Sequence, residues 1–250
     1  MKYRPVIFSA SILLVVTLAS SFASRAALGL VVDSCKISFA LTGTSFPCLK
    51  IVPAPQPLAA YAILREPTHK ERTILTPLAD VSGIEDPRLL ASDGPNYFDY
   101  AWKERSIVLG AYPEKDAWQD AALAINAESN RTQDHLHVHI GCVATRLKSV
   151  LASRSQDISA RQFQKISTKI AWRSFWVKFY EADSLSGINP FQIVADGVQG
   201  AREDMRDVAI GIVGAKRDNG QRGFYILAEL YGADNSYGSA EDLLDPRCRR

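Results

Sequence analysis

Three of the four histidines in this 250-residue chain stand on alternate positions of one short apolar stretch. They are His135, His137 and His139, in the sequence His-Leu-His-Val-His-Ile. A β-strand directs alternate side chains to one face, with about 6.5–7 Å between Cα atoms two residues apart, so we expect the three rings to converge. Neutral imidazole is a nucleophile and a metal ligand, so such a face can act on a phosphate or hold a metal ion. We favour this interpretation over three polar residues lining a wet sheet face, because histidine is not a strong strand former.

The stretch resembles a known signature. Histidines alternating with apolar residues mark the histidine-triad superfamily, whose members hydrolyse or transfer nucleotides at a phosphate. The preceding residues Leu123-Ala124-Ile125-Asn126 and Asn130-Arg131-Thr132-Gln133-Asp134, with Cys142 beyond the triplet, are similar to the bacterial CDP-diacylglycerol pyrophosphatase branch. That branch also has an N-terminal membrane segment, scattered cysteines and an additional C-terminal half.

The resemblance implies a mechanism. His137 would attack the α-phosphorus of CDP-diacylglycerol, release phosphatidate and leave a cytidylyl-histidine that water hydrolyses to CMP. His135 and His139 would orient His137 and donate to phosphate oxygens or to the leaving group. Thr132 stands where triad hydrolases often place a hydroxyl near the phosphate. No metal or other cofactor is expected.

The other polar residues before the triplet have less defined roles. Asn126 and Gln133 are candidates for the same pocket. Asn130-Arg131 departs from the Gly-Gln of small triad enzymes, although Arg131 can serve as a cationic donor to phosphate. Asp134 either holds a histidine tautomer or caps a turn.

Two other functions are compatible with the triplet. Three histidines on one strand face can bind zinc with a water in the open position, which would make the protein a zinc-dependent phosphohydrolase. The chain can also be a non-catalytic, membrane-anchored nucleotide- or lipid-binding module, because a fold alone does not establish a function.

The N-terminal residues predict a membrane location. Lys2 and Arg4 precede an uncharged apolar run, residues 5–24, that is about long enough to cross a bilayer as one helix. The run is a signal sequence or an anchor, and its length favours retention. The preceding positive charges favour a cytoplasmic N-terminus. We therefore expect a single-pass bacterial inner-membrane protein, with a periplasmic catalytic domain that acts on CDP-diacylglycerol in the bilayer.

The four cysteines agree with an oxidising compartment. None of them forms a Cys-x-x-Cys pair, so disulfides are favoured over zinc ligation. Four cysteines permit three pairings. We favour Cys35 with Cys48, which closes a short loop, and Cys142 with Cys248, which ties the C-terminal end to the triad strand.

Net charge gives no general reason for nucleic-acid binding, because it is only +2 over the whole chain. The remaining pattern predicts an α+β fold. Strands are expected at residues 61–64 and at 73–75, a helix capped by Asn96 reaches residue 109, and a segment from residue 116 or 117 leads to Asn126 and the triad strand. This order fits the antiparallel sheet of triad proteins.

Two residues near the second of these strands bear on the site. Small triad proteins often carry a histidine just before the strand that ends in proline, and Arg72 occupies that position here. His69 stands three residues earlier in a polar loop. We interpret it as a surface residue outside the site.

Beyond the triplet the sequence becomes basic. Arg161, Lys165, Lys169 and Arg173 recur every four residues and predict a helix with one basic stripe. Such a stripe either docks on anionic lipid headgroups or is a solvated helix face.

The last part repeats the element types of the first. Asn189-Pro190 predicts a helix start, with the helix running toward Met205. Residues 208–213 and 224–228 flank an Asn-Gly turn and predict a hairpin. We therefore divide the chain into a leader (1–25), a histidine-triad-like catalytic half (30–145), a basic helical connection (146–180) and a C-terminal α+β half (181–250). The last is interpreted as a degenerate, histidine-free copy that completes a pseudo-dimer, so that no oligomer is required.

Overall fold

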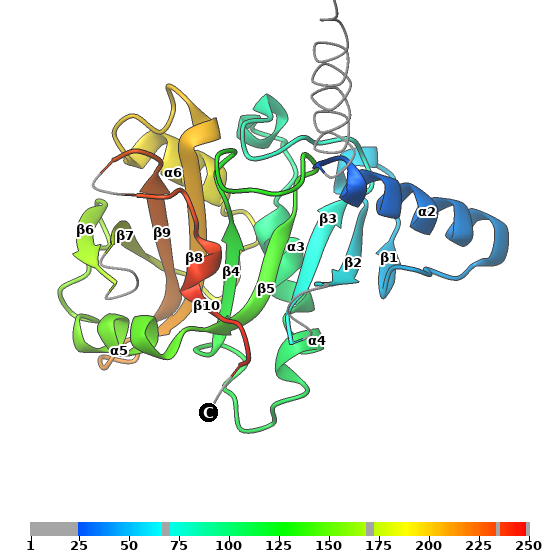
Figure 1. Cartoon of the computed structure of the whole chain (residues 1–250). Coiled ribbons are helices and arrows are strands. Elements are labelled where there is room, and N and C mark those ends of the chain that lie inside the picture. Colours follow the sequence, from blue (N-terminus) through cyan, green and yellow to red (C-terminus); the bar gives the residue numbers. More distant parts are fainter. Residues whose placement is uncertain (1–24, 67–70, 169–172, 234–235, 249–250) are drawn as a thin grey trace, which may run out of the picture.

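The computed structural model describes residues 25–66, 71–168, 173–233 and 236–248. Its strands form one ten-stranded sheet in the order β1-β2-β3-β5-β4-β8-β9-β7-β6, with β10 paired to β5 beside this path (Figure 1). Every pair of neighbouring strands is antiparallel. The predicted α+β class with an antiparallel sheet is therefore confirmed.

The strands vary from two to nine residues in length. They are β1 (Lys50–Val52), β2 (Tyr61–Arg65), β3 (Thr73–Pro77), β4 (Ala121–Ile125), β5 (Val138–Val143), β6 (Gln164–Ser167), β7 (Ser174–Glu181), β8 (Val208–Lys216), β9 (Arg222–Leu230) and β10 (Leu244–Asp245). The α-helices are α2 (Ala27–Thr42), α3 (Tyr97–Glu104), α4 (Ser106–Leu109), α5 (Thr145–Ser153) and α6 (Pro190–Gly197). Short 3-10 helices are η1 (Pro57–Ala59), η2 (Pro87–Leu90), η3 (Met205–Asp207) and η4 (Glu241–Leu243).

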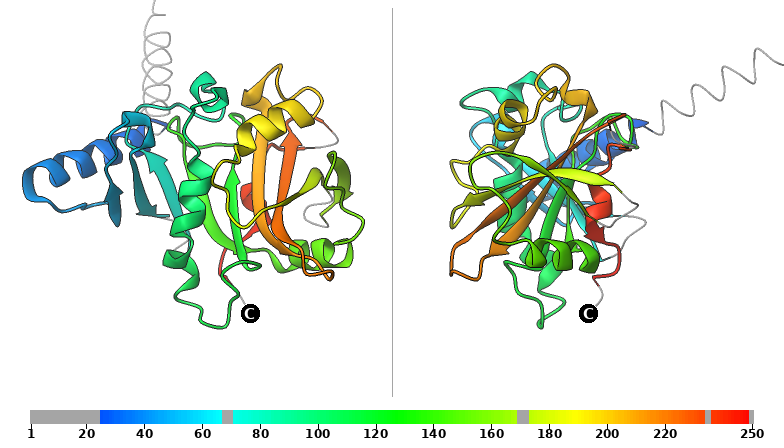
Figure 2. Two further views of the ribbon diagram at one scale, coloured as in Figure 1. Left: turned by 180° about the vertical axis from the view of Figure 1, so that it is seen from behind. Right: turned by 90° about the vertical axis from the view of Figure 1, so that its left-hand side faces the viewer.

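Each face of the sheet carries its own core. Leu123 and Ile125 of β4 belong to the core that includes side chains of α3 and α6, which cover the face seen in the left view of Figure 2. Ala122 and Ala124 belong to the core on the opposite face, which includes side chains of α5 and η4. Strand residues alternate between the two faces, and both faces of β4 are covered. All five residues of β4 are therefore apolar and buried.

The two halves of the chain meet within this sheet, mainly through the pairing of β4 with β8, besides the short pairing of β10 with β5. β4 from the first half pairs with β8 from the second, and Leu123 lies opposite Ile212. The sheet therefore continues from one half into the other.

Several local predictions are confirmed. The side chain of Asn96 accepts a hydrogen bond from the Asp99 amide at the start of α3, and that of Asn189 accepts from the amide of Phe191 at the start of α6. β8 and β9 form the expected hairpin, whose turn contains Gly220 with a φ of 85°. A positive φ carries little strain for glycine, so Asn-Gly is well suited to this turn.

The predicted basic helix is wrong. Lys165 lies in β6 and Arg173 directly precedes β7, whereas Lys169 lies outside the described residues. Arg173 is buried, and its guanidinium contacts Glu229 at 3.0 Å and Asp242 at 2.7 Å. The four-residue spacing is therefore not a helical stripe, and the segment from 146 to 180 contains most of α5 followed by β6 and most of β7. The C-terminal helix is also shorter than predicted, because α6 ends at Gly197, well before Met205.

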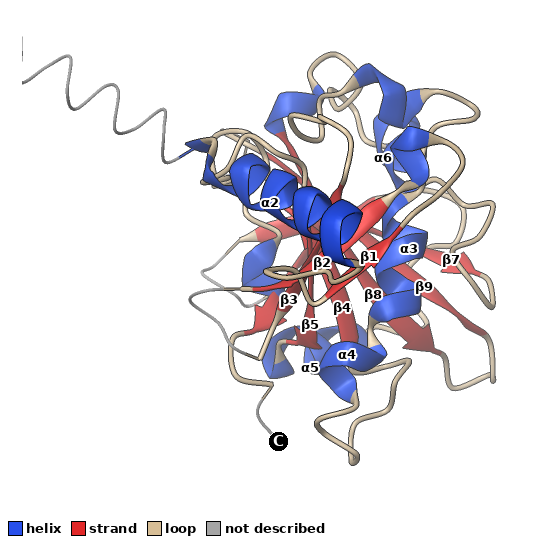
Figure 3. Cartoon of the chain, turned by 90° about the vertical axis from the view of Figure 1, so that its right-hand side faces the viewer, coloured by secondary structure: helices blue, strands red, loops and turns tan. Residues whose placement is uncertain are grey.

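Both predicted disulfides are confirmed. Cys35 bonds to Cys48, linking α2 to the segment before β1, and Cys142 bonds to Cys248, linking β5 to the C-terminal end. Figure 3 shows α2 lying across the edge of the sheet at β1 and β2.

The expectation of a membrane-spanning helix is corrected. Across the described ranges, no helix combines the length and the apolar character that crossing a bilayer requires. The predicted transmembrane helix and the single-pass inner-membrane location are not upheld by this finding, and the run at residues 5–24 lies outside the described residues.

The disulfides predict unequal contributions to stability. Replacing Cys142 and Cys248 by serine should lower the free energy of unfolding by about 5 kcal/mol, and replacing Cys35 and Cys48 by about 3 kcal/mol, because the closed loops span 106 and 13 residues. Urea titration followed by circular dichroism measures both losses, with the reduced unaltered chain as the control. A larger loss from the shorter loop would contradict the loop-entropy account.

Candidate functional site

The three histidines do not all lie on a strand. β5 begins at Val138, so that only His139 belongs to it. The preceding residues bond elsewhere, because the Leu136 amide donates to the carbonyl oxygen of Val81 at 2.7 Å and the Thr76 hydroxyl donates to the Leu136 carbonyl at 2.8 Å. These contacts replace the strand pairing that the alternating pattern predicts.

His135 is turned to the main chain rather than to a shared site. Its ring is buried, and Nε2 lies 3.0 Å from the carbonyl oxygen of Pro77, which can only accept a hydrogen bond. His137 and His139 are the pair that converge, with ring centroids 4.9 Å apart and rings nearly perpendicular. Of the three rings expected to converge, only those of His137 and His139 do so.

These two rings line a cavity of about 570 Å³. Most of its wall is apolar and comes from α2, the segment before β1, β2 and β3. The polar wall comes from the residues before β5, from the end of β2 and from η4. The lining residues include Leu28, Val31, Pro47, Leu49, Leu64, Ile74, Glu66, Thr132, Gln133, His137, His139 and Glu241.

His137 is held as a neutral imidazole. Its Nδ1 lies 2.8 Å from the carbonyl oxygen of His135, so Nδ1 carries the proton and Nε2 keeps its lone pair. Burial, with a smaller contribution from the charge of His139, lowers the pKa of His137 to about 4. The ring is therefore neutral at neutral pH, with no proton on Nε2, and can act as a nucleophile.

His139 forms a hydrogen bond with a carboxylate. Its Nδ1 lies 2.5 Å from Oε1 of Glu66, just after β2, so Nδ1 donates and the tautomer is fixed. Its Nε2 is buried, has no hydrogen-bond partner among the described residues, and lies 3.6 Å from Oε2 of Glu241. This ring therefore offers one nitrogen at the cavity that is not bonded to protein.

Arg72 joins the two carboxylates around His139. Its guanidinium lies 2.9 Å from Glu66 and 2.6 Å from Glu241 and is almost fully buried. Burial raises the pKa of Glu241, but the charges of His139 and Arg72 outweigh that effect, so the pKa is lowered and the carboxylate is ionised. We call Glu66, Arg72, His139 and Glu241 the His139 network.

The predicted pocket residues have different positions. Thr132 and Gln133 line the cavity, and the Gln133 side chain also accepts a hydrogen bond from the Leu28 amide at 2.7 Å, near the start of α2. Asn126 is buried at the end of β4, where its amide donates to Glu241 at 3.2 Å. It therefore contacts the His139 network.

Arg131 and Asp134 form ion pairs instead of the predicted contacts. Arg131 is buried and pairs with both oxygens of Glu85, at 2.6 and 2.9 Å. Asp134 pairs with Arg25 at 2.5 Å and with Arg131 at 3.1 Å. Neither expected role of Asp134, tautomer holder or turn cap, describes these contacts.

Sequence reasoning missed the carboxylates of the site. Glu66 and Arg72 flank the connection between β2 and β3, and the sequence pattern marks Arg72 only by its position before a strand. Glu241 lies over a hundred residues beyond the triplet, and no local pattern marks it. The pairing of β10 with β5 brings this segment to the site.

A metal-ligand set is present within the His139 network. Glu66, His139 and Glu241 offer ligand atoms that all lie within 4.8 Å of one another. A cation bound there would meet the positive charge of the Arg72 guanidinium, which already pairs with both carboxylates. The residues therefore fit an internal ion network better than a metal ion.

Comparison with known proteins identifies the family. A family model described as CDP-diacylglycerol pyrophosphatase matches residues 23–250. A CDP-diacylglycerol pyrophosphatase of Yersinia pestis is 34% identical over 194 residues, which cover 76% of this chain and 72% of that protein. The chain belongs to the CDP-diacylglycerol pyrophosphatase family.

The environment of His137 predicts its titration. In spectra of protein labelled with ¹⁵N-histidine, His137 should remain the neutral Nδ1–H tautomer at neutral pH and protonate near pH 4, because its folded pKa is lowered. His137→Gln assigns the signal. A titration midpoint near the ordinary value of 6.5 would contradict the site as described.

Proposed function

We propose that the protein hydrolyses the diphosphate of CDP-diacylglycerol to CMP and phosphatidate, with His137 as the nucleophile. Family membership supports the substrate and the overall reaction. The observation that carries the mechanism is the hydrogen bond from His137 Nδ1 to the His135 carbonyl at 2.8 Å. It leaves an unprotonated Nε2 on a ring beside a cavity.

The first step replaces one bond to phosphorus by another. The Nε2 lone pair of His137 attacks the α-phosphorus, and the bond from that phosphorus to the bridging oxygen breaks. The bridging oxygen leaves with phosphatidate, and the nucleotide stays on the ring as a cytidylyl-histidine. Water then attacks the same phosphorus, releases CMP and regenerates the neutral imidazole.

His139 is the proton donor to the leaving oxygen. Its Nδ1 is held by Glu66 and its Nε2 is not bonded to the described protein, so a protonated ring can donate only from Nε2. The carboxylates of Glu66 and Glu241 compensate the positive charge of that form. His135 has the supporting role of orienting His137 through its carbonyl oxygen.

Other predicted residues take supporting roles in this proposal. Thr132 and Gln133 line the cavity and contact the phosphates, whereas Asn126 acts through Glu241. Arg131 positions the segment before β5, because its guanidinium is already paired with Glu85.

The fold supports the proposed histidine-triad relationship. Strands of the first half lie in the order β2-β3-β5-β4, and those of the second half in the order β6-β7-β9-β8, so that β4 and β8 meet at the centre. Along the chain, α3 lies between β3 and β4 in the first half, and α6 lies between β7 and β8 in the second half. This mirrored order supports a C-terminal half that is a degenerate copy of the catalytic half.

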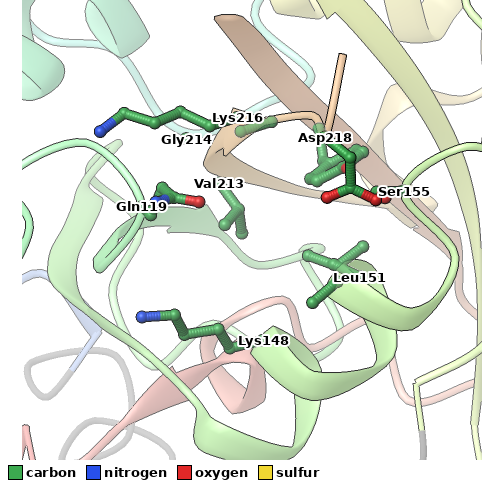
Figure 4. Close-up of a pocket in the computed structure, with 11 residues that line it drawn as sticks. Gln119, Lys148, Leu151, Ser155, Val213, Gly214, Lys216 and Asp218 are labelled. Carbon is green, nitrogen blue, oxygen red and sulfur yellow. The ribbon is translucent and has the colours of Figure 1, made fainter. Parts of the chain in front are cut away.

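The second half also has a cavity in a comparable place. It measures about 160 Å³ and lies between α5 and the end of β8 (Figure 4). The cavity beside His137 lies between α2 and the sheet. The lining of the smaller cavity includes Tyr225 of β9, which lies between β7 and β8 as His139 of β5 lies between β3 and β4. All four histidines precede residue 140, so the copy carries none.

Removing the nucleophile tests the proposed reaction. His137→Gln should abolish CMP release from CDP-diacylglycerol, because the glutamine amide is not a nucleophile toward phosphorus. Turnover of the unaltered chain should persist in excess EDTA, and circular dichroism checks that the variant is folded. Turnover by His137→Gln, or loss of activity in EDTA that zinc restores, would contradict the mechanism.

A second substrate separates proton donation from other roles of His139. His139→Gln should lower kcat for CDP-diacylglycerol by about 10²-fold or more, but much less for the p-nitrophenyl ester of CMP, because p-nitrophenolate leaves without a proton. Release of CMP and of p-nitrophenol measures the two rates. Equal losses with both substrates would contradict the role of His139 as the proton donor.

A further inference from the structure

The described residues expose large apolar side chains mainly in one region. Six of eight such residues lie on α2 or on the segment that follows it, and the other two are Tyr231 and Tyr237. We call the six the α2 apolar face; they are Leu30, Ile37, Phe39, Leu41, Phe46 and Leu49. Figure 1 shows α2 extending beyond the edge of the sheet at β1, so this face lies away from the two main cores.

The helix is apolar on two opposite sides. Leu28, Val32 and Cys35 are buried and pack toward β1 and β2. Leu30, Ile37 and Leu41 fall on one stripe at the helical repeat, about 200° around the axis from Leu28. A surface helix normally presents polar residues on the side away from its core. The second stripe therefore needs an explanation other than packing within the described fold.

We propose that the α2 apolar face docks on the surface of a phospholipid bilayer and delivers the lipid substrate to the cavity beside His137. This inference rests on the proposed function for the identity of the substrate. The face and the cavity are continuous, because Leu49 is exposed on the outside and also lines the cavity, next to Pro47 and Val31. Acyl chains can therefore pass from the bilayer to the cavity along an apolar path.

The polar groups at the end of α2 suit contact with hydrocarbon. The hydroxyls of Ser38, Thr42 and Thr44 bond to one another and to a helix carbonyl, at 2.8 to 3.0 Å. The Gly43 amide bonds to the Phe39 carbonyl and closes the helix end. Polar groups that are already hydrogen-bonded within the protein lower the free-energy cost of moving this end of the helix from water into hydrocarbon.

Charge and rigidity favour shallow apolar insertion over electrostatic attraction. Asp33 and Lys36 pair with each other at 2.9 Å, so the helix surface carries no unbalanced charge. The Cys35–Cys48 disulfide fixes the segment carrying Phe46 to the helix. We therefore expect binding that changes little with salt, unlike docking by a basic stripe.

A fluorescence measurement tests the docking without any substrate. In the full chain, Phe46→Trp is mixed with vesicles of phosphatidylcholine and a minority of phosphatidylglycerol that carry brominated acyl chains. Bromine quenches an inserted indole, so we expect emission from the added tryptophan to fall about twofold or more on binding. Tyr231→Trp is the matched control, since Tyr231 is also exposed but lies on the far half of the sheet, and its emission should not fall.

Two results would overturn docking in this experiment. Equal quenching, or no quenching, of the two tryptophans would show that the α2 apolar face does not enter the bilayer. A concentration-dependent blue shift of Phe46→Trp emission before vesicles are added would show that a second copy of the chain covers the face instead.

A kinetic comparison tests the delivery of substrate. Leu41→Ser with Phe46→Ser should lower kcat/KM by about tenfold or more for CDP-diacylglycerol in vesicles, because two large apolar side chains no longer insert. The same variant should leave kcat/KM unchanged for short-chain CDP-diacylglycerol dispersed as monomers, and Tyr231→Ser should affect neither. Equal losses on both substrates would overturn the delivery role.

The two proposals fail in different ways. Lack of turnover by the unaltered chain would contradict the proposed function while leaving the quenching result interpretable. Turnover that depends on His137 without selective quenching at position 46 would overturn only the docking.

Discussion

The buried ion network around His139 is the constraint on which the site depends. Its members come from three separate places in the chain: the connection between β2 and β3, strand β5, and η4 near the C-terminus. Glu66 and Glu241 carry negative charge, Arg72 carries positive charge, and a protonated His139 makes the set neutral. Burying ions costs several kcal/mol each, so a network of this kind is tolerated only when its members are paired.

This requirement explains several features of the fold. Glu241 reaches the network because β10 pairs with β5 and because Cys248 is bonded to Cys142 in the same strand. Asn126 adds a second tether, since its side chain bonds to both the amide and the carboxylate of Glu241. The C-terminal half therefore supplies a residue of the site, besides extending the sheet.

In the proposed mechanism, the same arrangement gives the two histidines different roles. Burial lowers the pKa of His137, and its Nδ1 bonds to a carbonyl oxygen, so the neutral ring keeps a lone pair on Nε2. His139 lies beside two carboxylates that can compensate a proton on its ring. In this proposal, the difference in surroundings suits His137 to nucleophilic attack and His139 to proton donation.

Sequence patterns predict several local elements correctly. Side-chain oxygens of Asn96 and Asn189 cap helix starts, and the Asn-Gly turn connects the hairpin. The alternating histidines mark a segment of which two members, His137 and His139, line the cavity. These features depend on residues close together in the chain, so their physical causes are visible in the sequence.

Features that depend on distant contacts were not visible. Basic residues at a four-residue spacing suggested a helix, but Arg173 is buried against Glu229 and the segment pairs as strands with the rest of the sheet. The alternation at His135 suggested a strand, but hydrogen bonds to Thr76 and Val81 hold that segment outside the ladder. Glu66 and Glu241 become part of the site only when the sheet brings them to His139.

The most direct test of the account is to trap the intermediate. Protein is mixed with CDP-diacylglycerol in excess EDTA, quenched within one turnover under conditions that preserve phosphohistidine bonds, and digested for mass spectrometry. The account predicts a CMP adduct on the imidazole of His137, formed and lost at rates that match CMP release. Turnover with no adduct on His137, or with incorporation of solvent oxygen in a single step that inverts the phosphorus centre, would contradict it.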